Sequence, residues 1–333
     1  MAVSVPNETS PDEANAAPTG NRRLTVGRMA DFAIVLTVAA LFIVLSVTSS
    51  AFLTSANLLN LLNQWAPVCF MALGGTLVLI AGGFDLSIGS IYAMSGVIAV
   101  VVTNHTTAPL GMLAGVLTGA LLGLGNGFFV SVLRMNVFVA TIGMSIVLSG
   151  LALVITGGAV IVTSNLNFEL FGTSTFLGVQ LAIWVMVVAI ALCALVLNRM
   201  PVGRYIRAIG GNIEAARLSG VRTEWVRTLT FVASGLGGGI AGVVVASDAV
   251  SANANAFSGA QYSVWTALLI GGNSMYGGEG AVWRTLIGVA MLALIGNGFD
   301  LLNVDPLYQE IVTGGILLAA VAVDMRIRHR RSG

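Results

Sequence analysis

Ionisable side chains are rare inside the apolar runs of this 333-residue chain, so the few that interrupt a run mark places where chemistry is possible. One such place is Gly82-Gly83-Phe84-Asp85-Leu86-Ser87. The two glycines can break a helix, and the acid and the serine precede the next apolar run. We expect Asp85 to act as a helix N-cap, because its position near the end of the run favours capping over contact with a substrate.

The alternative is that this break lines a pathway through a membrane. Polar groups at interrupted helices are typical of such pathways. Gly83, Asp85 and Ser87 are the candidates at the break. Asn126 and Asn297 are further candidates, because they occupy the same place in the repeated sequence Gly-Asn-Gly-Phe.

No catalytic or metal site is predicted. The chain has no His-Glu-x-x-His pattern, no Ser/His/Asp set and no nucleotide-binding loop. Cys69 and Cys193 stand at no motif spacing. Few acids lie deep in the apolar runs, which argues against a proton-driven carrier and against an ionic substrate. We expect no catalytic residue, no metal and no cofactor bound by this chain, and a neutral polar substrate for any transport, energised by a partner chain.

The longest polar interior segment, residues 198–227, is strongly basic. Only Glu214 and Glu224 offset its arginines, which are Arg199, Arg204, Arg207, Arg217, Arg222 and Arg227. Asn212 is predicted to cap a short helix here, with Glu214 in the first turn, where the helix dipole favours an anion. Gly220 is predicted to end it in the left-handed conformation. Such a helix is typical of a docking surface for a soluble partner, and the alternative is an ordinary basic cytoplasmic loop.

The elements that carry these residues are membrane-spanning helices. Hydrophobic residues make up 56% of the chain and charged residues 9%, whereas a soluble domain has about 25% charged residues. Runs long enough, or nearly long enough, to span a bilayer cover residues 32–49, 65–83, 88–103, 110–133, 137–156, 178–197, 228–249, 263–275, 281–302 and 308–324. We predict an all-α polytopic membrane bundle of about ten transmembrane segments, with short or broken helices at 88–103 and 263–275. The net charge of +1 gives no indication of a nucleic-acid partner.

The orientation follows from the basic residues, all 15 of which are arginine. With ten spans and a cytoplasmic N-terminus, no arginine is left outside, whereas one span more or fewer would place residues 198–227 outside. We expect residues 1–31 to form a disordered cytoplasmic tail, residues 32–325 the membrane domain and residues 326–333 a basic cytoplasmic tail. The outer stretches 157–177 and 248–262 are read as connections or as places that receive an external partner.

Small residues recur on several predicted spans. Glycines repeat from Gly115 to Gly127, around Gly235, and at Gly143 and Gly150. In lipid, small faces let helices approach closely, so we expect all three sets to pack helix against helix.

Four stretches together resemble a known family. They are Gly82-Gly83-Phe84-Asp85-Leu86-Ser87-Ile88-Gly89, then Asn126-Gly127 with Phe138 to Gly143, then Ala208 to Gly220, and then Gly271 to Gly280. In order and spacing, the chain over about 32–325 resembles permease subunits of bacterial sugar ABC importers of the ribose, xylose and galactose group, in the superfamily of branched-chain amino-acid permeases.

The resemblance implies a role and partners. Such permeases pair in the lipid of the bacterial cytoplasmic membrane, either with a second permease copy as a homodimer or with a paralogue as a heterodimer. A cytoplasmic ABC ATPase, which binds ATP and Mg, docks on the loop helix, and an extracytoplasmic sugar-binding protein delivers the substrate. The matching coupling residues here are Asn212, Glu214, Ala215, Ala216, Arg217 and Gly220. The Leu-Pro that usually follows the motif is missing, since residues 221–231 contain no proline.

Three functions are therefore weighed. The first is the transmembrane subunit of an ATP-driven importer for a neutral sugar or polyol, working by alternating access. The second is a secondary sugar carrier that needs no ATPase. The third is an integral-membrane enzyme or scaffold, for which the sequence offers no catalytic constellation.

Overall fold

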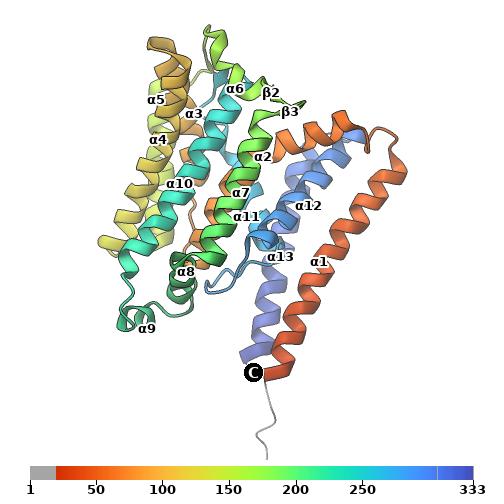
Figure 1. Ribbon diagram of the computed structural model, residues 1–333, viewed down its shortest axis with the longest axis vertical. Helices are drawn as coiled ribbons and strands as arrows, with labels where there is room; N and C mark the ends of the chain where they lie inside the picture. Colours follow the sequence, from red (N-terminus) through yellow and green to blue (C-terminus); the bar gives the residue numbers. More distant parts are fainter. Residues whose placement is uncertain (1–19, 306, 333) are drawn as a thin grey trace, which may run out of the picture.

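The computed structural model describes residues 20–305 and 307–332, which form a bundle of helices roughly parallel to one long axis (Figure 1). The helices in chain order are α1 (Gly20–Thr48), α2 (Ser55–Ile80), α3 (Ile88–His105), α4 (Ala108–Gly127), α5 (Val137–Thr156), α6 (Leu170–Thr173), α7 (Leu181–Arg199), α8 (Pro201–Gly211), α9 (Ile213–Leu218), α10 (Thr223–Asp248), α11 (Phe257–Ile270), α12 (Val282–Leu301) and α13 (Leu307–Ser332). A π-helical turn, η2 (Phe128–Val132), extends α4. The predicted all-α membrane bundle is confirmed.

Each of the ten predicted spans corresponds to a helix. Among the described residues, seven helices are long and apolar enough to cross a membrane: α2, α3, α4 with η2, α5, α7, α10 and α12. In α1 and α13 the apolar stretches are shorter, Ile34–Thr48 and Tyr308–Ala322. Helix α11 has 14 residues, as the short run at 263–275 predicted.

Two predicted boundaries differ from the structure. Helix α2 begins at Ser55, ten residues before the predicted run. Polar residues in its first turns hid it from a hydropathy scan, and one of them, Asn57, is paired with Asn297 of α12. Helix α1 begins at Gly20, so residues 20–31 of the expected disordered tail are helical. Adding residues to an existing helix is far easier than nucleating one, which accounts for the extension. Residues 1–19 lie outside the described residues.

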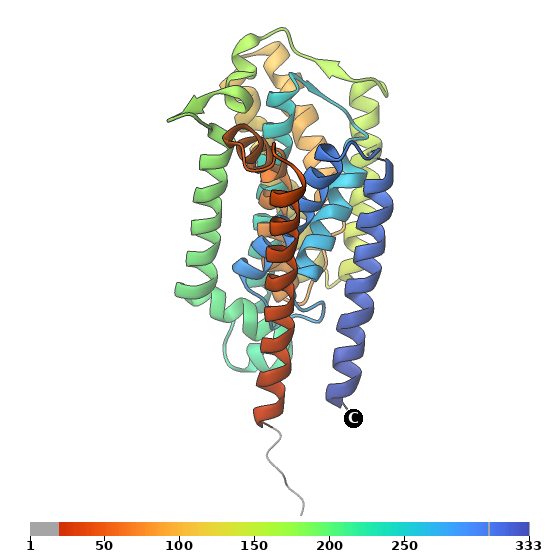
Figure 2. The same cartoon turned by 90° about the vertical axis from the view of Figure 1, so that its right-hand side faces the viewer.

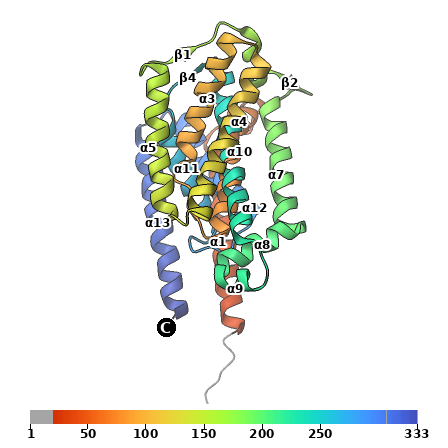
Figure 3. The same cartoon turned by 90° about the vertical axis from the view of Figure 1, so that its left-hand side faces the viewer.

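The two ends of the bundle are built differently (Figures 1 and 2). At one end, the outer stretches predicted as connections are tied together by a short antiparallel pairing of β1 (Ile161–Val162) with β4 (Ser251–Ala252). The same end of the bundle carries η3 (Leu166–Phe168) and the hairpin of β2 (Thr175–Phe176) and β3 (Val179–Gln180). At the other end lie α8, α9, the start of α1 and the end of α13 (Figure 3).

Helix α10 is the centre of the packing and contacts α2, α3 and α4. Its approach to α4 depends on glycine, because a Cβ at Gly119 would lie 2.3 Å from the Gly235 carbonyl oxygen and a Cβ at Gly235 would lie 2.1 Å from that of Gly119. Backbone therefore packs on backbone here, as the small residues predicted. The expectation was wrong within this chain for Gly143 and Gly150, where an added Cβ would have no neighbour within 4 Å.

This difference predicts opposite effects of one substitution. Gly235→Ala should lower the free energy of unfolding by about 1–3 kcal/mol, because the added methyl group overpacks the crossing of α4 and α10. Gly143→Ala should be neutral or stabilising by up to about 1 kcal/mol, because alanine favours a helix and the site is open. Thermal unfolding of both variants in detergent measures this. A native melting temperature for Gly235→Ala would contradict the packing described.

Candidate functional site

The short helix α9 is capped at its start as the sequence predicted. The Asn212 side-chain oxygen accepts a hydrogen bond from the Ala215 N–H at 3.0 Å. Glu214 lies in the first turn, where the positive end of the helix dipole faces it. Both features confirm the predicted helix start, and both depend only on residues of α9 and its cap.

The end of α9 is equally well defined. Gly220 has a φ of 84°, the left-handed conformation predicted for it. Its N–H donates to the Arg217 carbonyl at 3.0 Å, and the Val221 N–H donates to the Ala216 carbonyl at 3.1 Å. These two bonds form a Schellman motif, which satisfies carbonyl groups that the helix end would otherwise leave free.

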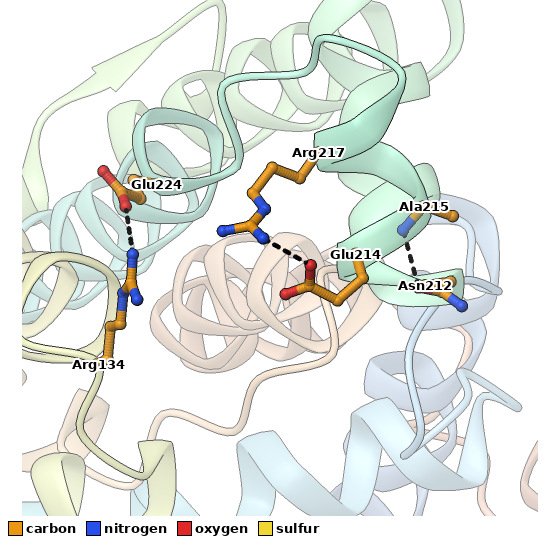
Figure 4. A network of polar contacts seen from close by, with 6 residues as sticks. All are labelled: Arg134, Asn212, Glu214, Ala215, Arg217 and Glu224. Atoms are coloured by element: carbon orange, nitrogen blue, oxygen red, sulfur yellow. Dashed lines mark hydrogen bonds and ion pairs between the residues drawn. The ribbon is translucent and has the colours of Figure 1, made fainter.

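One side of α9 faces outward and the other packs on the bundle (Figure 4). Leu218 is 84% exposed. Glu214 and Arg217 form an exposed ion pair, with 3.0 Å between the Glu214 Oε2 and Arg217 Nη2 atoms. Ala216, by contrast, packs into the hydrophobic core. Of the predicted coupling residues, Ala216 is therefore a packing residue, and a partner would meet the exposed side of the helix.

The basic segment 198–227, in which the sequence predicted one short helix, is helical over most of its length. It contains the last turn of α7, the whole of α8 and α9 and the first turns of α10. Arg207 is one reason for this order, because its Nη1 donates to the Leu197 carbonyl at 2.7 Å and its Nη2 donates to the Asn198 side-chain oxygen at 3.2 Å. Arg207 lies on α8 and satisfies a free carbonyl group at the C-terminus of α7, so it joins the two helices.

Three segments meet beside α8 at a glycine junction formed by Gly82, Gly210 and Gly277. The Gly278 N–H donates to the Ile80 carbonyl at 2.8 Å, which joins the turn before α12 to the end of α2. A Cβ at Gly210 would lie 1.8 Å from the same carbonyl oxygen, and a Cβ at Gly277 would lie 2.6 Å from the Gly82 Cα. No side chain fits between these backbones, so α8, α2 and the turn are held in direct contact.

Asp85 lies at the break between α2 and α3 and is fully buried. Its Oδ1 accepts from the Ser87 N–H at 3.0 Å and from the Ser87 hydroxyl at 2.6 Å, and its Oδ2 accepts from the Ser234 hydroxyl at 2.7 Å. Asn126 donates to the Ser87 hydroxyl oxygen at 2.6 Å.

The predicted N-cap role of Asp85 is wrong by two positions. Ser87 is the N-cap residue of α3, and its side chain makes no capping bond. Asp85 instead binds the Ser87 N–H one residue before the helix, and its other oxygen reaches across to α10. Its carboxylate is used to join two helices as well as to order the turn.

The five candidate pathway residues do not form one site. Asp85, Ser87 and Asn126 are in a single hydrogen-bond network, and Gly83 adjoins it, with its N–H donating to the Val78 carbonyl at 2.9 Å. Asn297 lies elsewhere, on α12. It exchanges two hydrogen bonds, of 2.9 and 3.1 Å, with the side chain of Asn57 on α2.

A family model decides what this bundle is. The model of the branched-chain amino acid transport system permease component matches residues 57–321. The chain belongs to this permease family.

Curated relatives agree with the family. The permease is 33% identical to the ribose import permease protein RbsC of Escherichia coli K12 over 92% of this chain and 97% of the relative. It is 34% identical to the L-arabinose ABC transporter permease protein AraH of Azospirillum brasilense over 98% and 97%. It is 35% identical to RbsC of Bacillus subtilis 168 over 86% and 90%. No solved structure matches. The resemblance seen in the sequence is thus confirmed, and the chain is a transport permease rather than an enzyme.

Sequence reasoning missed two contacts of the break. Ser234 bonds Asp85 across 149 residues, and the only local signal was a serine beside the glycines of α10. Phe84 stacks on Trp265 of α11, with 3.5 Å between ring centroids and 16° between ring planes. Both are contacts between distant segments, which periodicity along one segment does not indicate.

The break predicts the effects of two substitutions. Asp85→Ala should lower the free energy of unfolding by about 2–4 kcal/mol, because it leaves buried donors of Ser87 and Ser234 unpaired. Asp85→Asn should keep most of the stability, because its amide oxygen can accept from Ser87 while its amide nitrogen donates to Ser234. Thermal unfolding in detergent compares them. Equal losses in the two variants would show that the charge, and not hydrogen bonding, is what the break requires.

Proposed function

We propose that this permease is the transmembrane subunit of an ATP-driven importer that moves a neutral sugar or sugar-like polyol by alternating access. ATP and Mg bind to a separate cytoplasmic ABC ATPase, and this chain binds no cofactor. An extracytoplasmic sugar-binding protein supplies the substrate, and two permease copies pair in the membrane. The protein lies in the cytoplasmic membrane of a bacterium with both termini in the cytoplasm.

The observation that carries the proposal is the geometry of α9. Caps at Asn212 and Gly220 define both ends of this six-residue helix, and Ala216 packs it on the bundle. Its outward side presents Glu214, Arg217 and Leu218, which is a charged and apolar surface suited to a groove on a soluble protein. We infer that Asn212, Glu214, Ala215, Arg217 and Gly220 form or shape the docking surface, and that Ala216 anchors it.

The distribution of arginine supports the orientation. The end of the bundle that carries α8 and α9 also carries Arg134, within 3.7 Å of Glu224 at the start of α10. Helix α1 starts at this end, and α13 finishes there (Figures 1 and 3). Positive residues gather on the cytoplasmic side of membrane proteins, which places α9 where an ATPase can reach it.

The glycine junction supports a route for the motion. A displacement of α9 moves α8, and Gly210 of α8 lies directly against the end of α2 and the turn at Gly277. The end of α2 continues into the break at Gly83, Asp85 and Ser87. Tightly packed backbones transmit displacement rather than absorbing it. We propose that the break is the element that changes when the bundle opens to one side or the other.

The contacts of the break also bear on the pathway. Asp85, Ser87 and the amide nitrogen of Asn126 are hydrogen-bonded within one network that includes Ser234, so a substrate would reach these groups only after the network opens. The Asn126 Oδ1 atom has no partner among the described residues. Phe84, stacked on Trp265 of α11, moves with the break. Asn297 joins α12 to α2 and is assigned to the outer half of the bundle.

A neutral substrate fits the burial of charge. Among the side chains that the structure describes, Asp85 is the only fully buried carboxylate, and its oxygens are already bonded. An ionic substrate would need buried groups of opposite charge along its path. Relatives named for ribose and L-arabinose favour a sugar, with pentoses the first to test.

The strands β1 and β4 brace the end proposed to receive the binding protein.

A charge exchange on α9 tests the docking role. The double variant Glu214→Arg/Arg217→Glu keeps an ion pair within the helix but reverses the charges offered to a partner. We expect the assembled importer with this variant to lose most of its substrate-stimulated ATP hydrolysis. The rate should fall about tenfold or more if one charge pair with the partner is broken. Arg204→Glu, an exposed change on α8, is the control. Full stimulation in the double variant would contradict docking through these charges.

Transport in vesicles tests the energy source and the substrate class. The permease is reconstituted with its ATPase and binding protein, and uptake of labelled ribose, arabinose, xylose, galactose and ribitol is measured. We expect uptake of at least one neutral sugar or polyol only when ATP is present. Uptake by the permease alone, without the ATPase, would favour the second function, a secondary carrier.

A further inference from the structure

Two cavities adjoin on one side of the bundle, where α4 and η2 face the start of α10. The first, the apolar groove, has a volume of about 540 Å³ and is lined by Leu121, Leu124, Phe128 and Trp225 among others. The second, the arginine pocket, has a volume of about 190 Å³ and is lined by Arg134, Arg217, Arg227 and Ser131 among others. Glu224 lines both, so the groove opens beside the pocket.

The arginine pocket has an excess of positive charge. Its three arginines face two glutamates, Glu214 and Glu224. The pairs Glu214–Arg217 and Arg134–Glu224 are both more than half exposed, so they are weak and can rearrange around a ligand. Figure 4 shows the two pairs on separate elements, with Arg217 reaching from α9 toward the side of Arg134 and Glu224.

Hydrogen-bond donors without acceptors also line the pocket. Ser131 is 5% exposed, and its hydroxyl has no hydrogen-bond partner among the described residues. The buried Nε–H of Arg227 has no acceptor there either, and this arginine makes no ion pair in the described part of the chain. A buried donor without an acceptor is destabilising, and an anionic oxygen in the pocket would relieve this.

The apolar groove decides which anion this is. It runs along membrane-spanning helices and ends at the pocket, and its Trp225 is 66% exposed at the start of α10, the level at which tryptophan lies at a membrane interface. A soluble anion would use the pocket alone. An amphiphile with one negative head and an apolar tail matches both cavities, and basic pockets between helices at the membrane surface bind anionic lipid heads.

We propose that the groove and the pocket together bind one anionic phospholipid, with the phosphate among Arg134, Arg217 and Arg227 and an acyl chain against α4 and α10. The lipid belongs to the leaflet on the α9 side. The site needs no ATPase and no sugar. If α9 couples to an ATPase, a consequence that rests on the proposed function, a bound headgroup also holds Arg217, and with it α9, against α10.

Lipid binding to the purified permease alone tests this. Native mass spectrometry measures binding of phosphatidylglycerol against phosphatidylcholine, with the thermal shift from each lipid as a second readout. We expect Arg227→Gln to weaken phosphatidylglycerol binding about fivefold, since each arginine at a membrane surface contributes about that factor. Gly125 lines the groove, so Gly125→Phe should fill it and also weaken binding. The chain should accommodate this substitution, because the nearest atom to an added Cβ is the flexible end of a methionine, at 3.5 Å.

Matched controls make the outcome decisive. Arg204→Gln removes an exposed arginine on α8 outside the pocket, and Gly143→Phe adds a ring at an open site on α5. Both should bind phosphatidylglycerol as the native chain does. Equal weakening by Arg204→Gln would overturn the proposal in favour of general charge attraction. A thermal shift from inorganic phosphate equal to that from phosphatidylglycerol, with no effect of Gly125→Phe on binding, would overturn the proposal in favour of a free-anion site.

Discussion

A chain that breaks a helix inside a bundle must satisfy the polar groups that the break sets free, and Asp85 does this here. One carboxylate binds the Ser87 N–H and two serine hydroxyls, one of them on α10. No water is needed to complete these bonds, so the turn between α2 and α3 can lie buried among helices. The close approach of α4 to α10 at Gly119 and Gly235 accompanies these bonds, and Asn126 of α4 donates to Ser87 at the same break.

A second constraint is the absence of side chains where α8 meets the rest of the bundle. The backbones of α2, α8 and the turn before α12 meet there without intervening side chains, at Ile80, Gly210 and Gly277. A bulky residue at Gly210 would separate α8 from α2. The exposed helix α9 and the buried break are thereby connected through a few residues, which is the arrangement that a protein driven from one end requires.

The sequence predicted what depends on neighbouring residues and missed what depends on distant ones. Asn212, Glu214 and Gly220 obey rules that operate within one turn, so the limits of α9 were correct. The contact of Asp85 with Ser234 joins segments 149 residues apart, and no local pattern indicates it. The first turns of α2 were missed because amides such as Asn57 look like loop residues until their partner, Asn297, is known. Gly143 looked like a packing residue because glycine spacing does not show which side of a helix has a neighbour.

The proposed transport depends on contact between α9 and the ATPase. Site-directed cross-linking tests this contact most directly, with the native Cys69 and Cys193 replaced by alanine and a single cysteine placed by Leu218→Cys. Leu177→Cys, at a position that is 79% exposed at the opposite end between β2 and β3, is the matched control. We predict a cross-link to the ATPase from position 218 and none from position 177. A cross-link from position 177, or none from position 218 in an assembled complex, would contradict the account.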